Sequence, residues 1–194
     1  NALAANTTAS NNVAIGKDAL IANTTGNTNV AIGTDAMTTN VAGDRSVAVG
    51  EQALQNMNPS GNVDMYNTAV GYNAGFSIST GIQNTIVGGL AGDAITTGNY
   101  NIAVGVGSLS TLSTGAENVA IGVSAMTNST TCSNNVAVGG QALQECTTGA
   151  SNVAIGHNAL DANTTASNNT AVGKDALGAN TTGSENTAVG QAAG

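Results

Sequence analysis

The sequence is poor in the residues that most soluble domains use to build a core and a charged surface. It has no tryptophan, one proline, three tyrosines and one phenylalanine, and only 7% of its residues are charged. A typical domain carries about a quarter charged residues. No run of about eighteen apolar residues occurs and no signal-peptide pattern is found, so we expect no membrane insertion of this segment.

The charge balance limits the kinds of partner that the chain is expected to bind. Eleven acidic residues against three basic ones give a formal net charge of −8. Nucleic-acid binding needs a basic footprint, so we expect no nucleic-acid partner.

The sequence is dominated by one repeated motif, Asn-Val-Ala-Ile-Gly and its variants. Its closing glycine recurs at Gly16, Gly33, Gly50, Gly71, Gly88, Gly105, Gly122, Gly139, Gly156, Gly173 and Gly190. Every step is seventeen residues except Gly50 to Gly71, which is twenty-one. A fixed short period predicts a solenoid. Repeat positions below are counted from this strand-closing glycine.

Each copy predicts one coil. Positions −3 and −1 carry β-branched residues, such as Val13 and Ile15, which favour a strand. Position −2 is alanine in ten of eleven copies, with Ile86 as the exception. Apolar residues on both faces indicate that both faces are covered, and we expect partner chains to cover the alanine face. Ala19-Leu20 and its equivalents at +3 and +4 predict a second short strand, before a polar turn such as Asn-Thr-Thr-Gly.

Stacked coils about 4.8 Å apart would form an all-β parallel solenoid, a rod on the order of 50 Å long in eleven coils of about seventeen residues. Asparagine at −4, replaced only by Ser46, predicts a ladder of side-chain hydrogen bonds along the rod. Residues 1–194 are expected to be a single repeat array, part of a longer fibre.

The region 55–100 is the least regular. The four additional residues should leave the coil as a loop near 55–66, because Asn58-Pro59-Ser60-Gly61 has turn composition. Leucine at +4 gives way to glycine where Ile78 and Ile95 appear, which indicates compensating core changes. A recognition patch is the alternative interpretation, and its candidate residues are Asn58, Pro59, Asp64, Tyr66, Tyr72 and Phe76.

The string Asn-x-Ala-Ile/Val-Gly-x-x-Ala-Leu resembles the head repeats of trimeric autotransporter adhesins of the Yersinia adhesin type. With Asn-Thr-Thr-Gly appended, it is also similar to repeats of bacteriophage tail fibres and appendages. The resemblance implies a left-handed parallel β-roll, three chains around one axis, and an extracellular place on a virion fibre or bacterial cell surface. The coil here is longer, and the adhesin pattern lacks the insertion after Gly50.

No chemistry is predicted, so we expect no enzyme, catalytic residue, metal or cofactor. The one histidine, His157, falls at a variable surface position. Cys132 and Cys146 lack zinc spacing, and a small buried thiol at Cys146 is the favoured interpretation, with a disulfide as the alternative. Asp18 and Asp35 share position +2 in adjacent coils, and we interpret them as solvated carboxylates rather than a cation site.

The pattern therefore predicts a structural rod segment that spaces or presents a host- or surface-binding tip, assembled as a parallel homotrimer. A second hypothesis makes the segment itself a recognition module for a host cell-surface glycan or protein. The third is an ice-binding solenoid. Paired threonines such as Thr24-Thr25 recur, but neighbours point to opposite faces, whereas a flat threonine array needs alternate positions.

Overall fold

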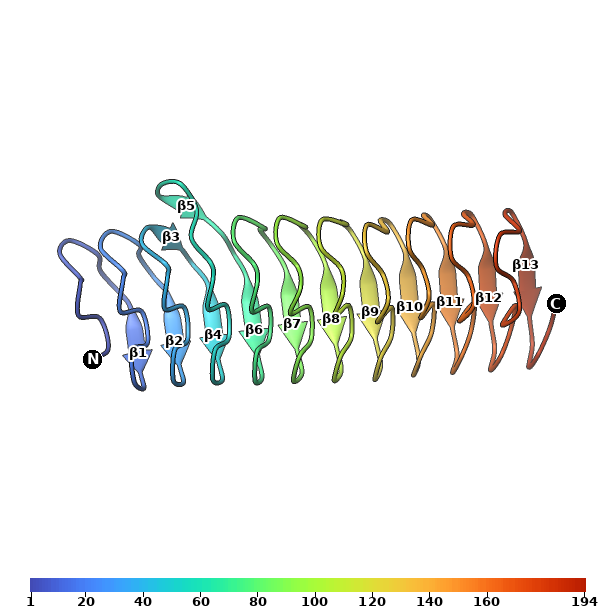
Figure 1. Cartoon of the computed structure of the whole chain (residues 1–194), viewed down its shortest axis with the longest axis horizontal. Coiled ribbons are helices and arrows are strands. Elements are labelled where there is room, and N and C mark those ends of the chain that lie inside the picture. The colour runs from blue at the N-terminus through green and yellow to red at the C-terminus, as the bar shows by residue number, and fades with distance from the viewer.

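The computed structural model describes residues 1–194, which form one row of stacked coils with the two termini at opposite ends (Figure 1). The strands are β1 (Val13–Ile15), β2 (Val30–Ile32), β3 (Gly43–Asp44), β4 (Val47–Val49), β5 (Val63–Asp64), β6 (Thr68–Val70), β7 (Thr85–Val87), β8 (Ile102–Val104), β9 (Val119–Ile121), β10 (Val136–Val138), β11 (Val153–Ile155), β12 (Thr170–Val172) and β13 (Thr187–Val189). The predicted all-β parallel solenoid is confirmed, and its turns number about ten.

Every copy of the repeated motif supplies one strand to a single sheet. Eleven strands pair in parallel in the order β1-β2-β4-β6-β7-β8-β9-β10-β11-β12-β13. The register joins like to like, so that Val136 pairs with Val119 and Val153, and Ala137 lies between its own copies. The repeat thus fixes the register, because each coil places the same residue above the one before it.

The alanine at −2 lies inside the coil. Ala31, Ala48 and Ala120 are fully buried within a single chain, whereas Ile121, the −1 neighbour of Ala120, is 40% exposed. The expectation that partner chains cover the alanine face is therefore wrong. The short methyl side chain fits a narrow interior, and the larger β-branched residues at −3 and −1 face outward.

The second predicted strand is also absent. The Ala-Leu pair at +3 and +4 is buried, but Leu20 and Met37 have φ of 51° and 50°, in the left-handed region. The chain is therefore a tight turn at this point and cannot be extended. Coils still bond here, since the N–H of Leu20 donates to the carbonyl of Ala36 in the next coil (3.0 Å).

The asparagine ladder at −4 is confirmed. The backbone N–H of Asn84 donates to Oδ1 of Asn67 (2.9 Å), and its Nδ2 donates to the same oxygen (3.2 Å). The same Nδ2 also donates to the carbonyl of Gly98 in the next coil (2.9 Å). Where Ser46 replaces asparagine, its Oγ accepts the N–H of Asn67 (3.3 Å), so the ladder continues. Each buried amide thereby joins three coils and is satisfied, as a buried polar group must be.

The core compensates where leucine is missing at +4. A Cβ added at Gly92 would lie 2.9 Å from Cδ1 of Ile95 and 3.0 Å from Cδ1 of Ile86. Ile95 stands at +7, where several other coils carry a buried asparagine, and it fills the space that leucine would take. The predicted exchange of side chains within the core is confirmed.

The insertion divides into two parts. Gly43 pairs with Val63, twenty residues on, whereas Val47 pairs with Thr68, twenty-one residues on. Against the seventeen-residue repeat, three additional residues precede β5 and one more lies between β5 and β6. The three protrude with β5, which stands out from the row beside β3 (Figure 1).

The fourth additional residue is Met65. Tyr66 has the left-handed φ (50°) found at −5 in other coils, such as Arg45 (56°), so Met65 is the residue with no counterpart. Its side chain is fully buried. The expectation that all four residues leave as a loop is therefore wrong for one of them, which forms a bulge that faces the core.

Candidate recognition surface

The features that could meet a partner lie on the outside of the rod. The structure contains no pocket and no group of three or more His, Cys, Asp or Glu side chains that could hold a metal ion. None of its elements is a helix with the length and hydrophobicity needed to cross a membrane.

The first surface feature is the outer face of the eleven-stranded sheet, formed by positions −3 and −1 and called here the strand face. Its exposed apolar members are Val13, Ile15, Val70, Val87, Ile102, Ile121, Ile155 and Val189. They occur along the whole sheet, so the strand face is a continuous β-branched surface. Contiguous apolar patches of this kind usually mark an interface.

A second feature lies at the base of the insertion loop. The Arg45 guanidinium forms an ion pair with the Asp64 carboxylate, and the Tyr66 hydroxyl donates to Asp64 Oδ2 (3.2 Å). The guanidinium carbon lies 5.9 Å from the centre of the Tyr66 ring, within cation–π range. The neighbouring carboxylate raises the pKa of Arg45. These contacts hold the tyrosine in place, although half of its side chain remains exposed.

The loop itself bends back toward the N-terminus. Thr25 Oγ1 donates to Oδ1 of Asn62 (2.9 Å), thirty-seven residues away and two coils earlier. Pro59 is buried, and a Cβ added at Gly43 would lie 3.1 Å from its ring carbons. The loop is therefore anchored on the rod and is not a free projection.

The structure brings together only part of the predicted patch. Asn58, Pro59, Asp64 and Tyr66 lie in the loop or at its base, as the sequence suggested. Tyr72 is exposed, but it follows β6, at the end of that strand opposite to Tyr66.

Phe76 is also outside this cluster. It is half-buried in the turn after β6, and its carbonyl accepts the N–H of Asn56 (3.1 Å). Arg45 was missed by the sequence argument, because its regular coil gave no sign that it contacts the insertion.

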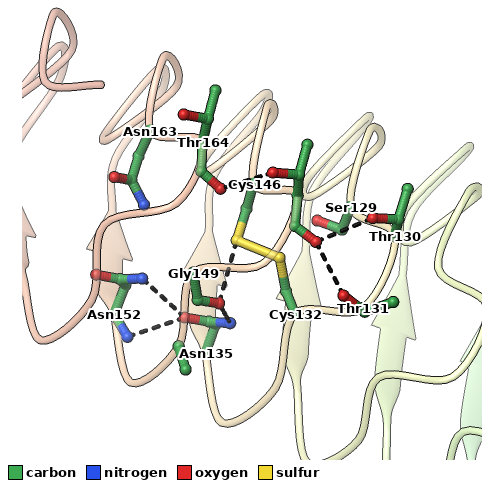
Figure 2. Close-up of a disulfide and its surroundings, with 12 residues drawn as sticks. Ser129, Thr130, Thr131, Cys132, Asn135, Cys146, Gly149, Asn152, Asn163 and Thr164 are labelled. Carbon is green, nitrogen blue, oxygen red and sulfur yellow. Dashed lines mark hydrogen bonds between the residues drawn. A yellow bond between two sulfur atoms is a disulfide. The ribbon is translucent and has the colours of Figure 1, made fainter. Parts of the chain in front are cut away.

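The two cysteines are bonded to each other. Cys132 and Cys146 form a disulfide between adjacent coils, with Cα atoms 6.5 Å apart, and no cysteine is free (Figure 2). Both are fully buried, so the position was correctly interpreted, but the interpretation as a free thiol is wrong. The bond crosses two different repeat positions, because Cys132 replaces the turn glycine at −7 while Cys146 stands at +7.

Thiol titration checks this bond. In denaturant without a reductant, we expect the purified chain to show no reactive thiol, because both sulfur atoms are bonded. After reduction in the same denaturant, two thiols should appear per chain, the number of cysteines in the sequence. Two thiols before reduction would contradict the disulfide.

The remaining polar candidates carry no site. His157 is exposed, as expected of a surface position. Asp18 lies near Lys17 (4.0 Å) and belongs to no metal-ligand group. Burial raises the pKa of Asp93, and its Oδ1 accepts no hydrogen bond.

The paired threonines differ in exposure. Thr147, the first of its pair, is half-buried, and its hydroxyl donates to the carbonyl of Thr164 in the next coil (3.1 Å). Thr148, the second, is exposed. The hydroxyl of the first threonine is therefore used within the rod.

Comparison with known proteins found no match of this sequence to a protein-family model, to a curated protein or to a solved structure.

Proposed function

We propose that this chain is a rigid rod segment of an extracellular fibre, which spaces or presents a surface-binding tip. The observation that carries the proposal is the uninterrupted eleven-stranded sheet with its exposed strand face. Coils that stack in one register make a stiff linear body whose stability grows with each neighbour contact. The disulfide supports an oxidising, extracellular setting, because such bonds are rare in the cytosol.

We further propose that three parallel copies form the fibre, each a left-handed β-roll with its strand face toward the common axis. A parallel arrangement with cyclic symmetry brings the same coil of every copy to the same height. Ile121 of one copy would then meet its equivalents, and a face that a single chain leaves in water would be covered. The resemblance to adhesin heads and phage fibres supports this assembly, on a virion or a bacterial cell surface.

Light scattering tests the assembly. We expect a particle of about three times the chain mass of 18.7 kDa. The double variant Ile121→Lys/Ile155→Lys should dissociate it, because two charges per chain would be buried in an apolar interface. Thr97→Lys/Thr148→Lys, which places the same charges on exposed side chains outside the strands, should remain trimeric. A stable folded monomer in the unmodified protein would overturn the trimer.

A further inference from the structure

One column of the rod changes character over five consecutive coils. At position −5 these coils carry long side chains, which we call the tyrosine strip: Arg45, Tyr66, Gln83, Tyr100 and Glu117. The other coils carry shorter side chains at the same position (Asn11, Thr28, Asn134, Ser151 and Asn168), except the last coil, which carries Glu185. Aromatic side chains occur at this position only within the strip, so they are a local feature of the surface and not a product of the repeat.

The backbone fixes the strip. All five residues have φ between 50° and 59°, in the left-handed region. The N–H of Tyr100 donates to the carbonyl of Ile82 (3.1 Å), and that of Gln83 donates to Met65 (2.8 Å). Tyr66 and Tyr100 are 49% and 48% exposed, and two coil steps of about 4.8 Å separate them by about 9.6 Å. Gln83 is exposed and occupies the same position in the coil between those of the two tyrosines.

The core beneath the strip is apolar. The four coils that bear Tyr66, Gln83, Tyr100 and Glu117 carry at +7 the fully buried residues Met57, Ile78, Ile95 and Leu112. The coil that bears Arg45 has the buried polar residue Asn40 at this position, and the coil after Glu117 has the buried polar residue Ser129. Four of the five strip residues, including both tyrosines, thus belong to coils with a packed apolar interior, and rigid support of this kind favours a preformed site.

These groups fit one class of ligand. An aromatic ring has a negatively polarised face that attracts the C–H bonds of a pyranose ring. Amide, guanidinium and carboxylate groups beside it can donate to and accept from sugar hydroxyls. The Arg45–Asp64 contacts already hold Tyr66, so little side-chain freedom would be lost on binding.

The spacing of the two tyrosines indicates which glycans fit the strip. In an extended β1,4-linked glycan, alternate sugars present the same face, so equal contacts recur at every disaccharide. Two tyrosine rings about 9.6 Å apart along a straight column would likewise make equal contacts with alternate sugars of such a chain. We propose that the tyrosine strip binds an extended β1,4-linked glycan that lies along the rod axis, with sugars against Tyr66 and Tyr100 and the intervening polar contacts at Gln83. This is a binding activity beyond the rod function proposed above.

Titration calorimetry with three linear hexasaccharides tests the strip: β1,4-linked glucose, β1,4-linked N-acetylglucosamine and, as a coiled control, α1,4-linked glucose. We expect saturable binding of at least one β1,4-linked chain and none of the α1,4-linked chain. Tyr66→Ala and Tyr100→Ala should each weaken binding by about tenfold, a loss of roughly 1.4 kcal/mol. Tyr72→Ala is the matched control, since Tyr72 is 52% exposed but lies outside the strip.

Two results would overturn the proposal. One is no saturable binding of either β1,4-linked hexasaccharide, including the case in which a protein partner binds the strip instead. The other is an equal loss in Tyr72→Ala. Circular dichroism of each variant checks that the rod is folded, and light scattering of the same samples tests assembly separately. Failure of the strip is therefore distinguishable from failure of the fibre.

Discussion

Alanine in place of Gly88 should lower the free energy of unfolding by about 4 kcal/mol, the sum of backbone strain and steric overlap. Gly88 has φ of 140°, a conformation that side chains strongly disfavour, and an added Cβ would lie 2.5 Å from the carbonyl oxygen of Gly105. The next coil therefore stacks directly on this glycine. Because the rod is held by contacts between neighbours, displacing one coil weakens the stack on both sides of it.

Gly89 is the matched control for this substitution. It is the adjacent residue, yet an added Cβ would meet no atom within 4 Å. Gly89→Ala should therefore change stability by no more than about 0.5 kcal/mol. Urea unfolding followed by circular dichroism measures both variants. Equal effects at the two glycines would contradict the close stacking of strand-closing glycines as the cause.

Much of this architecture could be predicted from the sequence, because a solenoid is ordered along one direction. The seventeen-residue period, the parallel pairing and the asparagine ladder all follow from identical residues meeting in adjacent coils. Which face of the strand is buried could not be predicted the same way. Ala120 and Ile121 are both apolar, so the pattern alone does not give the direction, and the narrow interior selects the smaller residue.

The surface cluster illustrates a second limit. Tyr66 and Tyr72 are six residues apart in the sequence, but they lie at opposite ends of β6. Arg45 is twenty-one residues from Tyr66, yet its guanidinium lies 5.9 Å from the ring. Proximity in a solenoid depends on repeat position more than on distance along the chain, and the insertion hides the correspondence until its residues are assigned.

The disulfide could not be predicted from the repeat period alone either. Cys132 and Cys146 are fourteen residues apart and occupy different repeat positions, so no ladder of like residues joins them. Their contact depends on how the cross-section of one coil lies against the next. That cross-section is set by turns at residues with left-handed φ, such as Leu20 and Met37. The residue types do not reveal these turns, since leucine and methionine are also ordinary residues for an extended segment.

The two parts of the insertion should respond in opposite ways to change. Deletion of Ser60–Asn62 removes three exposed or half-exposed residues and leaves Pro59 between Asn58 and Val63. The preceding coil has the same count, one residue between Val41 and Gly43. Since shortening a small surface loop changes its closure free energy by well under about 1 kcal/mol, the stability of the rod should be nearly unchanged.

Met65→Ala should instead lower the free energy of unfolding by about 3 kcal/mol, because it leaves a cavity at a fully buried side chain. Thermal and urea unfolding of the two variants measure the contrast. The deletion removes Asn62 and its two exposed hydrogen bonds with Thr25, which together are worth about 1 kcal/mol. A rod that unfolds on deletion of Ser60–Asn62 but tolerates Met65→Ala would show that the loop, and not the buried bulge, holds this part of the solenoid together. The reverse result would mean that the rod accommodates the insertion by burying one residue and excluding three, and that the loop is free to vary without altering the coils that carry the tyrosine strip.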